Sequence, residues 1–189
     1  MLYRRIIATP MGEIIVIADS DALLFCGWKN ERNNKMVRLL KGYQHDAENL
    51  ENIYNNPCPA GEVSASPLSA PSKGEKILIK AVSFLNDYFG GKRIDSQGFD
   101  IPPGTEFQKR VWKEISLIPY GETITYKELA RRVGCIRGVR AVAQACGANP
   151  ISVIIPCHRV TATNNIGGYA GGVEKKIKLL EMENDTMRN

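Results

Sequence analysis

A cysteine and a histidine stand side by side in the stretch VIIPCHRV, residues 153–160. A cysteine becomes a nucleophile when a cation, a general base or aligned amide dipoles stabilise its thiolate. Cys157 has His158 and Arg159 as neighbours, and Glu183 reaches the same place if the last helix folds back. Adjacent side chains on an extended chain point to opposite sides, so we expect a bridging water between Cys157 and His158.

The residues around Cys157 leave a second interpretation open. A cysteine that follows a Val-Ile-Ile run is often a buried small hydrophobe with no chemical role. Two features favour reactivity instead. Pro156 ends the ladder pairing of the predicted strand and places Cys157 at a strand exit, and the glycine-rich loop at residues 167–172 allows close approach to a ligand.

The elements that would position these residues indicate an α/β (α+β) fold. Residues 3–28 alternate apolar and polar side chains around turn signals, which predicts two or three antiparallel strands. Residues 55–74 are rich in Pro and Ser and lack periodicity, which indicates a loop. We therefore expect a strand-rich N-terminal α/β domain over residues 1–95 and a mostly helical domain over residues 96–189 with a short active-site strand.

Capping signals mark where the helices begin. Three pairs with capping-box spacing precede apolar periodic segments: Ser72 with Glu75, Thr105 with Gln108, and Thr125 with Glu128. A further short helix is predicted over residues 138–147, and a last one begins at residue 173. The two short helices after Thr125 and before residue 147, joined by a glycine-containing turn, are typical of a helix-turn-helix.

The positive charge of the chain is concentrated around these helices. The net charge is +5. Residues 105–160 hold nine basic and four acidic side chains, whereas the rest of the chain carries sixteen of each. Such a segment is expected to meet a polyanion, although a basic face that only keeps the protein soluble remains an alternative at this point. Arg140, near the start of the second short helix, is best placed to project into a groove.

Composition also limits the class of protein. The chain has no apolar run long enough to span a membrane and no export signal at its start, so we expect a cytoplasmic protein, nucleoid-associated in a prokaryote. Five widely spaced cysteines without a CxxC pair indicate a reducing compartment. The two histidines, His45 and His158, have no partner at metal-ligand spacing, so we expect no metal and no cofactor.

Several motifs together resemble one known family. IPCHRV at 155–160 is preceded by ANP at 148–150 and followed by GGYAGG at 167–172 and KLLEME at 178–183. This order and spacing is similar to that of the O6-alkylguanine-DNA alkyltransferases, the methylated-DNA–protein-cysteine methyltransferases. The resemblance runs from about Thr105 to Glu183. Residues 1–90 match only in general form, as a small variable strand-rich domain.

The resemblance implies a role for each matching residue. Cys157 would accept the alkyl group from O6 of guanine, His158 would act as its base through a water, and Glu183 would orient the imidazole. Asn149 would brace the turn before the active-site strand, and Tyr126 would help to donate a proton to the departing guanine. Arg140 would enter the base stack as a finger in place of the flipped base. Val160 and Ala170 would line the pocket that receives that base.

The implied substrate is double-stranded DNA that contains alkylated bases, bound by a monomer that reacts once and irreversibly. A base inside the duplex is out of reach of a protein nucleophile, so it must be turned out of the stack. The range of alkyl groups, O4-alkylthymine included, stays open.

Some residues depart from the family pattern, and other functions compete. Position 170 is Ala where relatives often have Ser, and Cys26 and His45 do not reproduce the zinc ligands of some relatives. A helix-turn-helix protein that binds lesions or regulates, with Cys157 incidental, is the main alternative. A cysteine hydrolase using Cys157 and His158 is a third, but it leaves the basic helices unexplained.

Overall fold

The N-terminal part of the chain is a three-stranded antiparallel sheet. The computed structural model describes residues 2–29, 70–96 and 98–188. Strands β1 (Tyr3–Thr9), β2 (Gly12–Ala18) and β3 (Leu23–Trp28) pair in the order β1-β2-β3. The prediction of antiparallel strands over residues 3–28 is confirmed. Residues 55–69 of the predicted loop at 55–74 lie outside the described residues.

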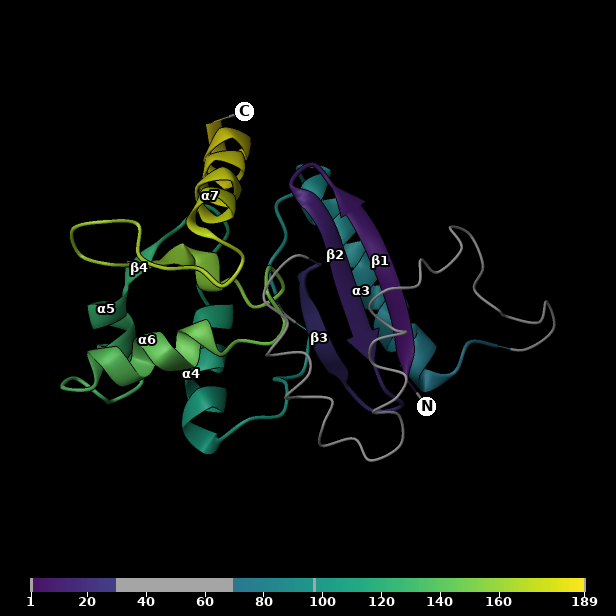
Figure 1. Cartoon of the computed structure of the whole chain (residues 1–189), viewed down its shortest axis with the longest axis horizontal. Coiled ribbons are helices and arrows are strands. Elements are labelled where there is room, and N and C mark those ends of the chain that lie inside the picture. The colour runs from purple at the N-terminus through teal and green to yellow at the C-terminus, as the bar shows by residue number, and fades with distance from the viewer. Residues whose placement is uncertain (1, 30–69, 97, 189) are drawn as a thin grey trace.

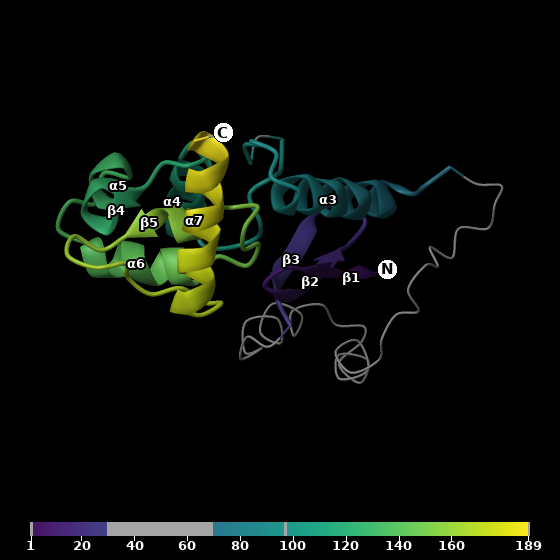
Figure 2. The same cartoon turned by 90° about the horizontal axis from the view of Figure 1, so that it is seen from above.

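Helix α3 (Lys73–Phe89) covers one face of this sheet (Figures 1 and 2). Its capping box is present in both directions, with Ser72 and Glu75 each bonding the backbone of the other. The apolar face of the helix packs on inward-facing strand residues, with Leu78, Ala81, Leu85 and Tyr88 buried. Burial of this face fixes α3 to the sheet, because apolar area removed from water is the main favourable term in such packing.

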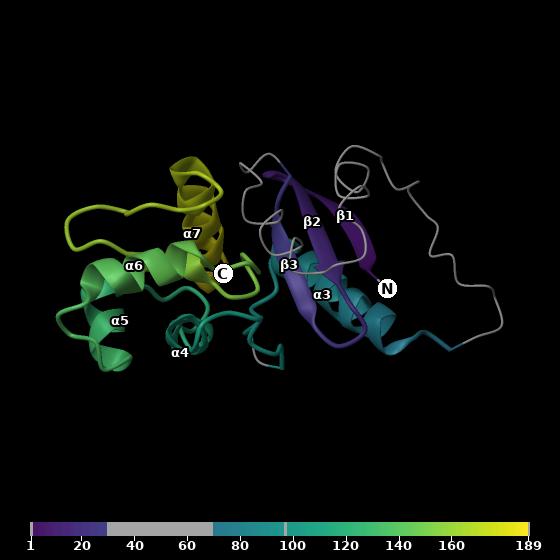
Figure 3. The same cartoon turned by 60° about the horizontal axis from the view of Figure 1, so that its bottom comes forward.

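The C-terminal part is mostly helical, as expected. It contains α4 (Glu106–Ser116), α5 (Tyr126–Arg132), α6 (Val139–Gly147) and α7 (Val173–Arg188), and Figure 3 shows α4, α5 and α6 packed beside one another. The capping box at the start of α4 is complete. At α5 only half of the box forms, because Thr125 caps the Glu128 amide while the Glu128 carboxylate pairs with Arg131 and Arg132.

The segment before Cys157 differs from the predicted extended strand. Residues 151–155 form a tight turn with only isolated bridges, in which the Ile154 amide donates to the Ser152 carbonyl and Val153 has a φ of 71°. Cys157 then opens a 3-10 helix, η1 (Cys157–Arg159). The short strand at the site is β5 (Val160–Thr161), which pairs in parallel with β4 (Ile124–Thr125) and follows the cysteine. A β-branched side chain at positive φ is uncommon, and buried packing holds it there.

Strand β3 connects the two parts of the chain at this turn. The Cys26 amide donates to the Pro150 carbonyl over 2.9 Å, and the Ser152 amide donates to the Cys26 carbonyl over 2.7 Å. One cluster of buried hydrophobic side chains runs through both parts and includes Trp28 and Trp112. The division at residues 95 and 96 stays a prediction, but the sheet and the site turn share backbone bonds and a core.

Within the described ranges, no helix is long and apolar enough to cross a bilayer. The same residues contain no group of three or more His, Cys, Asp or Glu side chains that could hold a metal ion. His45 and Cys58 fall outside the described residues.

Candidate functional site

The thiol of Cys157 lies in a buried site, where it is 5% exposed. Asn149 connects it to the preceding turn: its Nδ2 donates to the Ile155 carbonyl over 2.8 Å and to Cys157 Sγ over 3.2 Å. The Asn149 Oδ1 accepts from the Ile151 amide over 3.1 Å. One amide side chain therefore ties the turn after α6 to the sulfur and presents an N–H to it, an arrangement that stabilises negative charge on the sulfur.

His158 is paired with Glu183 through one ring nitrogen. Its Nε2 lies 2.7 Å from Glu183 Oε1, and both side chains are fully buried. Burial lowers the pKa of His158 against the opposing effect of Glu183, so the imidazole is neutral at pH 7. A carboxylate accepts, so Nε2 carries the proton and Nδ1 presents a lone pair. Nδ1 is buried and has no hydrogen-bond partner among the described residues.

Glu183 holds its charge because donors surround it. Arg159 donates from Nε to Oε2 over 3.0 Å and from Nη2 to Oε1 over 3.0 Å, and the Gly121 amide donates to Oε2 over 3.0 Å. Gly121 has a φ of 77°, which a residue with a side chain rarely adopts. Burial raises the pKa of Glu183, but the bonds from His158 and Arg159 outweigh that effect and lower it to about 2.

Two charged or polar residues of this array were not anticipated as partners of Glu183. Arg159 was considered only as a cation next to Cys157, yet it is 2% exposed and bonds Glu183 and the Ile118 carbonyl. Tyr88, from α3, donates its hydroxyl to Glu183 Oε1 over 2.6 Å. No sequence signal near Tyr88 indicates this contact, because it joins residues 95 positions apart.

Tyr126 and Lys176 also lie near the thiol. The Tyr126 hydroxyl donates to the Gly168 carbonyl over 3.4 Å, and burial raises the pKa of Tyr126, with Cys146 and Cys157 adding to that effect. Lys176 is fully buried and its Nζ donates to the carbonyls of Val160 over 2.6 Å and Gly168 over 3.2 Å. Burial lowers the pKa of Lys176, which sequence reasoning did not single out. Lys176 lies seven residues before Glu183, and residues at that spacing share one face of a helix. This spacing could have indicated from the sequence that Lys176 faces the site.

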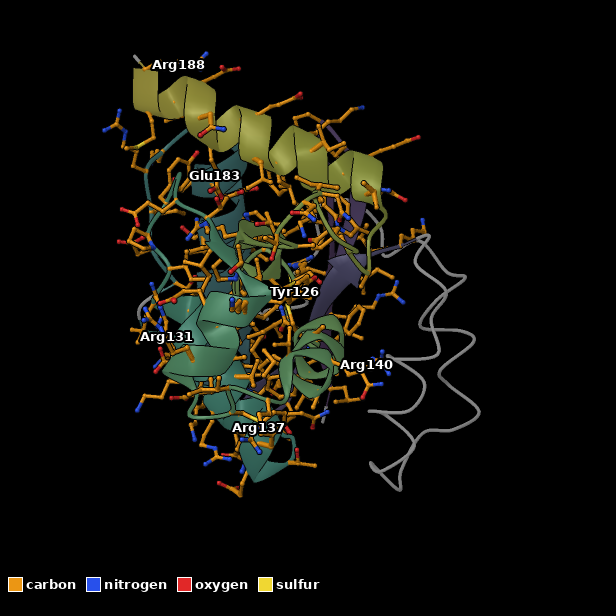
Figure 4. All side chains as sticks on the ribbon, turned by 90° about the vertical axis from the view of Figure 1, so that its left-hand side faces the viewer. Tyr126, Arg131, Arg137, Arg140, Glu183 and Arg188 are labelled. Atoms are coloured by element: carbon orange, nitrogen blue, oxygen red, sulfur yellow. The ribbon has the colours of Figure 1, made fainter. Side chains whose placement is uncertain are left out.

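Of the residues expected to contact DNA, Arg140 lies apart from this buried array, whereas Tyr126 and Val160 adjoin it. Arg140 is exposed on α6, and Figure 4 shows it with Arg131 and Arg137 around the two short helices and their connection. Val160 is fully buried, whereas Ala170 is exposed on the glycine-rich loop. The structure thus brings together Cys157, Asn149, His158 and Glu183, and leaves Arg140 on the surface.

Comparisons with known proteins indicate the family of the chain. The family model described as "6-O-methylguanine DNA methyltransferase, DNA binding domain" matches residues 106–185. A methylated-DNA–protein-cysteine methyltransferase of Methanosarcina barkeri is 36% identical over 191 residues, which cover 99% of this chain and 100% of that relative. A probable methylated-DNA–protein-cysteine methyltransferase of Acanthamoeba polyphaga mimivirus is 51% identical over 109 residues, which cover 57% of this chain and 73% of the relative.

A solved structure is similar over nearly the whole chain. The crystal structure of a Mycobacterium tuberculosis relative in complex with DNA has a TM-score of 0.66 and 30% identity, and the match covers 97% of this chain and 93% of that one. The likeness therefore includes the N-terminal sheet as well as the helical part.

Proposed function

Because the chain belongs to the methylated-DNA–protein-cysteine methyltransferase family, we propose that it repairs DNA by transferring an alkyl group from O6 of guanine to Cys157. The observation that carries this proposal is the buried array in which Asn149 donates to Cys157 Sγ while Glu183 orients a neutral His158. Double-stranded DNA with alkylated bases is then its partner, which a monomer in the cytoplasm would engage.

The reaction is a direct displacement at the alkyl carbon. The Cys157 thiolate forms the new S–C bond while the bond from carbon to guanine O6 breaks, and the electron pair of that bond stays on the guanine. The base leaves more easily when it takes up a proton, and Tyr126 is proposed to help supply that proton. Burial raises the pKa of Tyr126, so its hydroxyl carries a proton at neutral pH. A thioether does not hydrolyse under mild conditions, so each molecule reacts once.

His158 would take the proton of the thiol through a water at Nδ1. The buried Nδ1 lone pair supports this role, since Nε2 is already committed to Glu183. As the imidazole gains charge, the carboxylate of Glu183 stabilises it at the opposite nitrogen, which is the orienting logic of catalytic triads. The 3-10 helix at Cys157 turns adjacent side chains to different sides, so a relay fits better than a direct bond.

The helix-turn-helix would deliver the base. α5 and α6 pack on each other and carry exposed basic side chains, which suit phosphate contacts that do not depend on sequence. Arg140 is proposed to enter the base stack in place of the flipped nucleotide, while Val160 and Ala170 line the pocket for it. Extrusion costs a few kcal/mol and least for a damaged base, which helps to select the lesion.

The test is a titration of duplex DNA that contains O6-methylguanine with increasing protein. We expect one methyl group removed from DNA per protein molecule, with no turnover, and no removal by Cys157→Ser. If lesions are bound with full affinity but DNA keeps its methyl groups, the chain is a lesion-binding or regulatory protein and the proposal is wrong.

A further inference from the structure

Tyr88 brings the N-terminal part of the chain into the buried array around His158. Its hydroxyl donates to Glu183 Oε1 over 2.6 Å, and its oxygen lies 3.3 Å from His158 Nε2. The side chain is fully buried, and its ring packs edge-on against Phe89 and Tyr120. Tyr88 lies before residues 106–185, so the contact comes from outside the part matched by the DNA-binding family model.

We propose that Tyr88 is a positioning residue for alkyl transfer, whose hydroxyl limits the pull of Glu183 on the Nε2 proton of His158. The proposal rests on the transfer reaction proposed above. Tyr88 acts through Glu183 and His158, not on the alkyl group. Through it, the N-terminal part of the chain sets the strength of the base.

Tyr88 and His158 donate to the same acceptor atom. Glu183 Oε1 accepts from Tyr88 at 2.6 Å and from His158 at 2.7 Å. When His158 takes up a proton at Nδ1, the positive ring is stabilised by the negative charge on Oε1. Arg159 Nη2 also donates to Oε1, over 3.0 Å, so Tyr88 is one of two further donors on that oxygen. Each further donor draws on the same negative charge, so the Tyr88 hydroxyl weakens the stabilisation of the imidazolium. The contact of 3.3 Å between the Tyr88 oxygen and Nε2 acts in the opposite sense, but it is longer and weaker.

The other charged and titratable groups around His158 are unchanged by the loss of this one hydroxyl. Glu183 and Lys176 face it from α7, Arg159 adjoins it, and the Tyr169 ring packs edge-on against it. Arg159 and Lys176 lower the pKa of His158, and Glu183 raises it. The Tyr88 hydroxyl itself stays protonated, because burial and the neighbouring Glu183 raise the pKa of Tyr88.

Tyr88→Phe removes the hydroxyl and keeps the ring, and Tyr120→Phe is the matched control. Tyr120 packs against Tyr88, but its own hydroxyl bonds Thr186 Oγ1 at 3.4 Å. We would titrate the ring protons of His158 by NMR, identified by their loss in His158→Gln, and measure the transfer rate over the same pH range. Tyr88→Phe should raise the NMR midpoint and move the acid limb of the rate to higher pH, each by about 0.5 to 1 unit, and Tyr120→Phe should move neither.

A second substitution tests the direction of the shift in the His158 midpoint without removing an atom from the array. A fluorinated tyrosine at position 88 is a stronger donor, so it should move the His158 midpoint to lower pH. Equal midpoints for Tyr88→Phe, Tyr120→Phe and the parent protein would overturn the proposal, as would an unmoved midpoint with the fluorinated residue. The NMR titration requires no alkyl transfer, so it decides the role of Tyr88 even if the parent protein takes up no methyl group, which would count against the proposed function alone.

Discussion

Glu183 is the residue on which the buried array depends most. It accepts from His158, Arg159, Tyr88 and the Gly121 amide inside a site closed to solvent. Removal of a buried charge leaves its partner unpaired, which costs far more than the pair itself contributes. The carboxylate therefore pairs with the proposed base, His158, and also neutralises the buried Arg159.

Glu183→Gln should lower the free energy of unfolding by about 3–5 kcal/mol, because Arg159 would stay buried without a counter-ion. Glu128→Gln is the matched control, since Glu128 pairs only with the more exposed Arg131 and Arg132, and it should change stability by less than about 1 kcal/mol. Urea unfolding followed by circular dichroism measures both. Similar losses in the two variants would contradict the view that Glu183 neutralises a buried cation.

Protonation of His158 makes the free energy of unfolding depend on pH. Burial lowers its folded pKa below the ordinary 6.5, so the unfolded chain binds more protons as pH falls. The stability that the neutral His158 contributes is fully present above pH 6.5 and is lost as the pH falls toward the pKa of the folded state. Glu183 adds a second loss, which begins below its ordinary 4.5 and continues to about 2.

Between pH 7.5 and 5.5 the protein should therefore lose about 1 kcal/mol of stability that His158→Gln does not lose. His45→Gln retains His158 and should keep the full loss. Denaturant unfolding at both pH values provides the comparison. A parent protein whose stability rises toward pH 5.5 would mean that His158 is charged in the folded state.

In the proposed function, helices α5 and α6 present the DNA-reading surface, and Arg140 enters the base stack from α6. Arg140→Ala should slow methyl transfer from duplex DNA roughly tenfold or more, because the vacated stack is no longer filled. Transfer from the free base O6-methylguanine needs no extrusion and should be unchanged. Equal slowing on both substrates would mean that Arg140 acts in the transfer step or stabilises the fold.

Arg137→Ala is the matched change on the connection between these helices. Arg137 is exposed, and we expect it to contact phosphate. Its loss should weaken DNA binding similarly on all sequences and reduce the slope of log affinity against log salt by about 1. Binding isotherms at several salt concentrations measure that slope, and an unchanged slope would remove Arg137 from the interface.

The sequence predicted elements better than the contacts between them. The caps at Ser72 and Thr105 are local, because residues three positions apart satisfy each other, and both helix starts are confirmed. The Val153 turn was missed, because the apolar run has the composition of a strand and its positive φ is imposed by packing. The family motif located Cys157, His158 and Glu183, but Tyr88 lies 70 positions from His158 and has no motif.

At the scale of the whole molecule, the sheet and the helical part depend on each other. In β3, the amide and the carbonyl of Cys26 both bond the turn before the site, and Tyr88 on α3 donates to Glu183. The shared hydrophobic core includes Trp28 in the sheet and Trp112 in α4, whose indole N–H donates to the Ala145 carbonyl. Elements linked in this way unfold together more readily than separate domains do.

We expect a single cooperative unfolding transition. Trp28→Phe and Trp112→Phe each leave one tryptophan, which reports on one part of the chain. In each variant the fluorescence midpoint should coincide with the circular dichroism midpoint. If either tryptophan reported a separate transition, the two parts would be independent, and the predicted boundary near residue 95 would also be a boundary of stability.

Peptide mapping after the reaction shows whether Cys157 is the residue that accepts the alkyl group. The protein is incubated with duplex DNA containing O6-methylguanine, digested, and each of its five cysteines is assigned by mass spectrometry. We expect one added methyl group, located on the peptide of Cys157 and absent in Cys157→Ser. A fully folded protein with an unmodified Cys157, or with the methyl group on another cysteine, would contradict it.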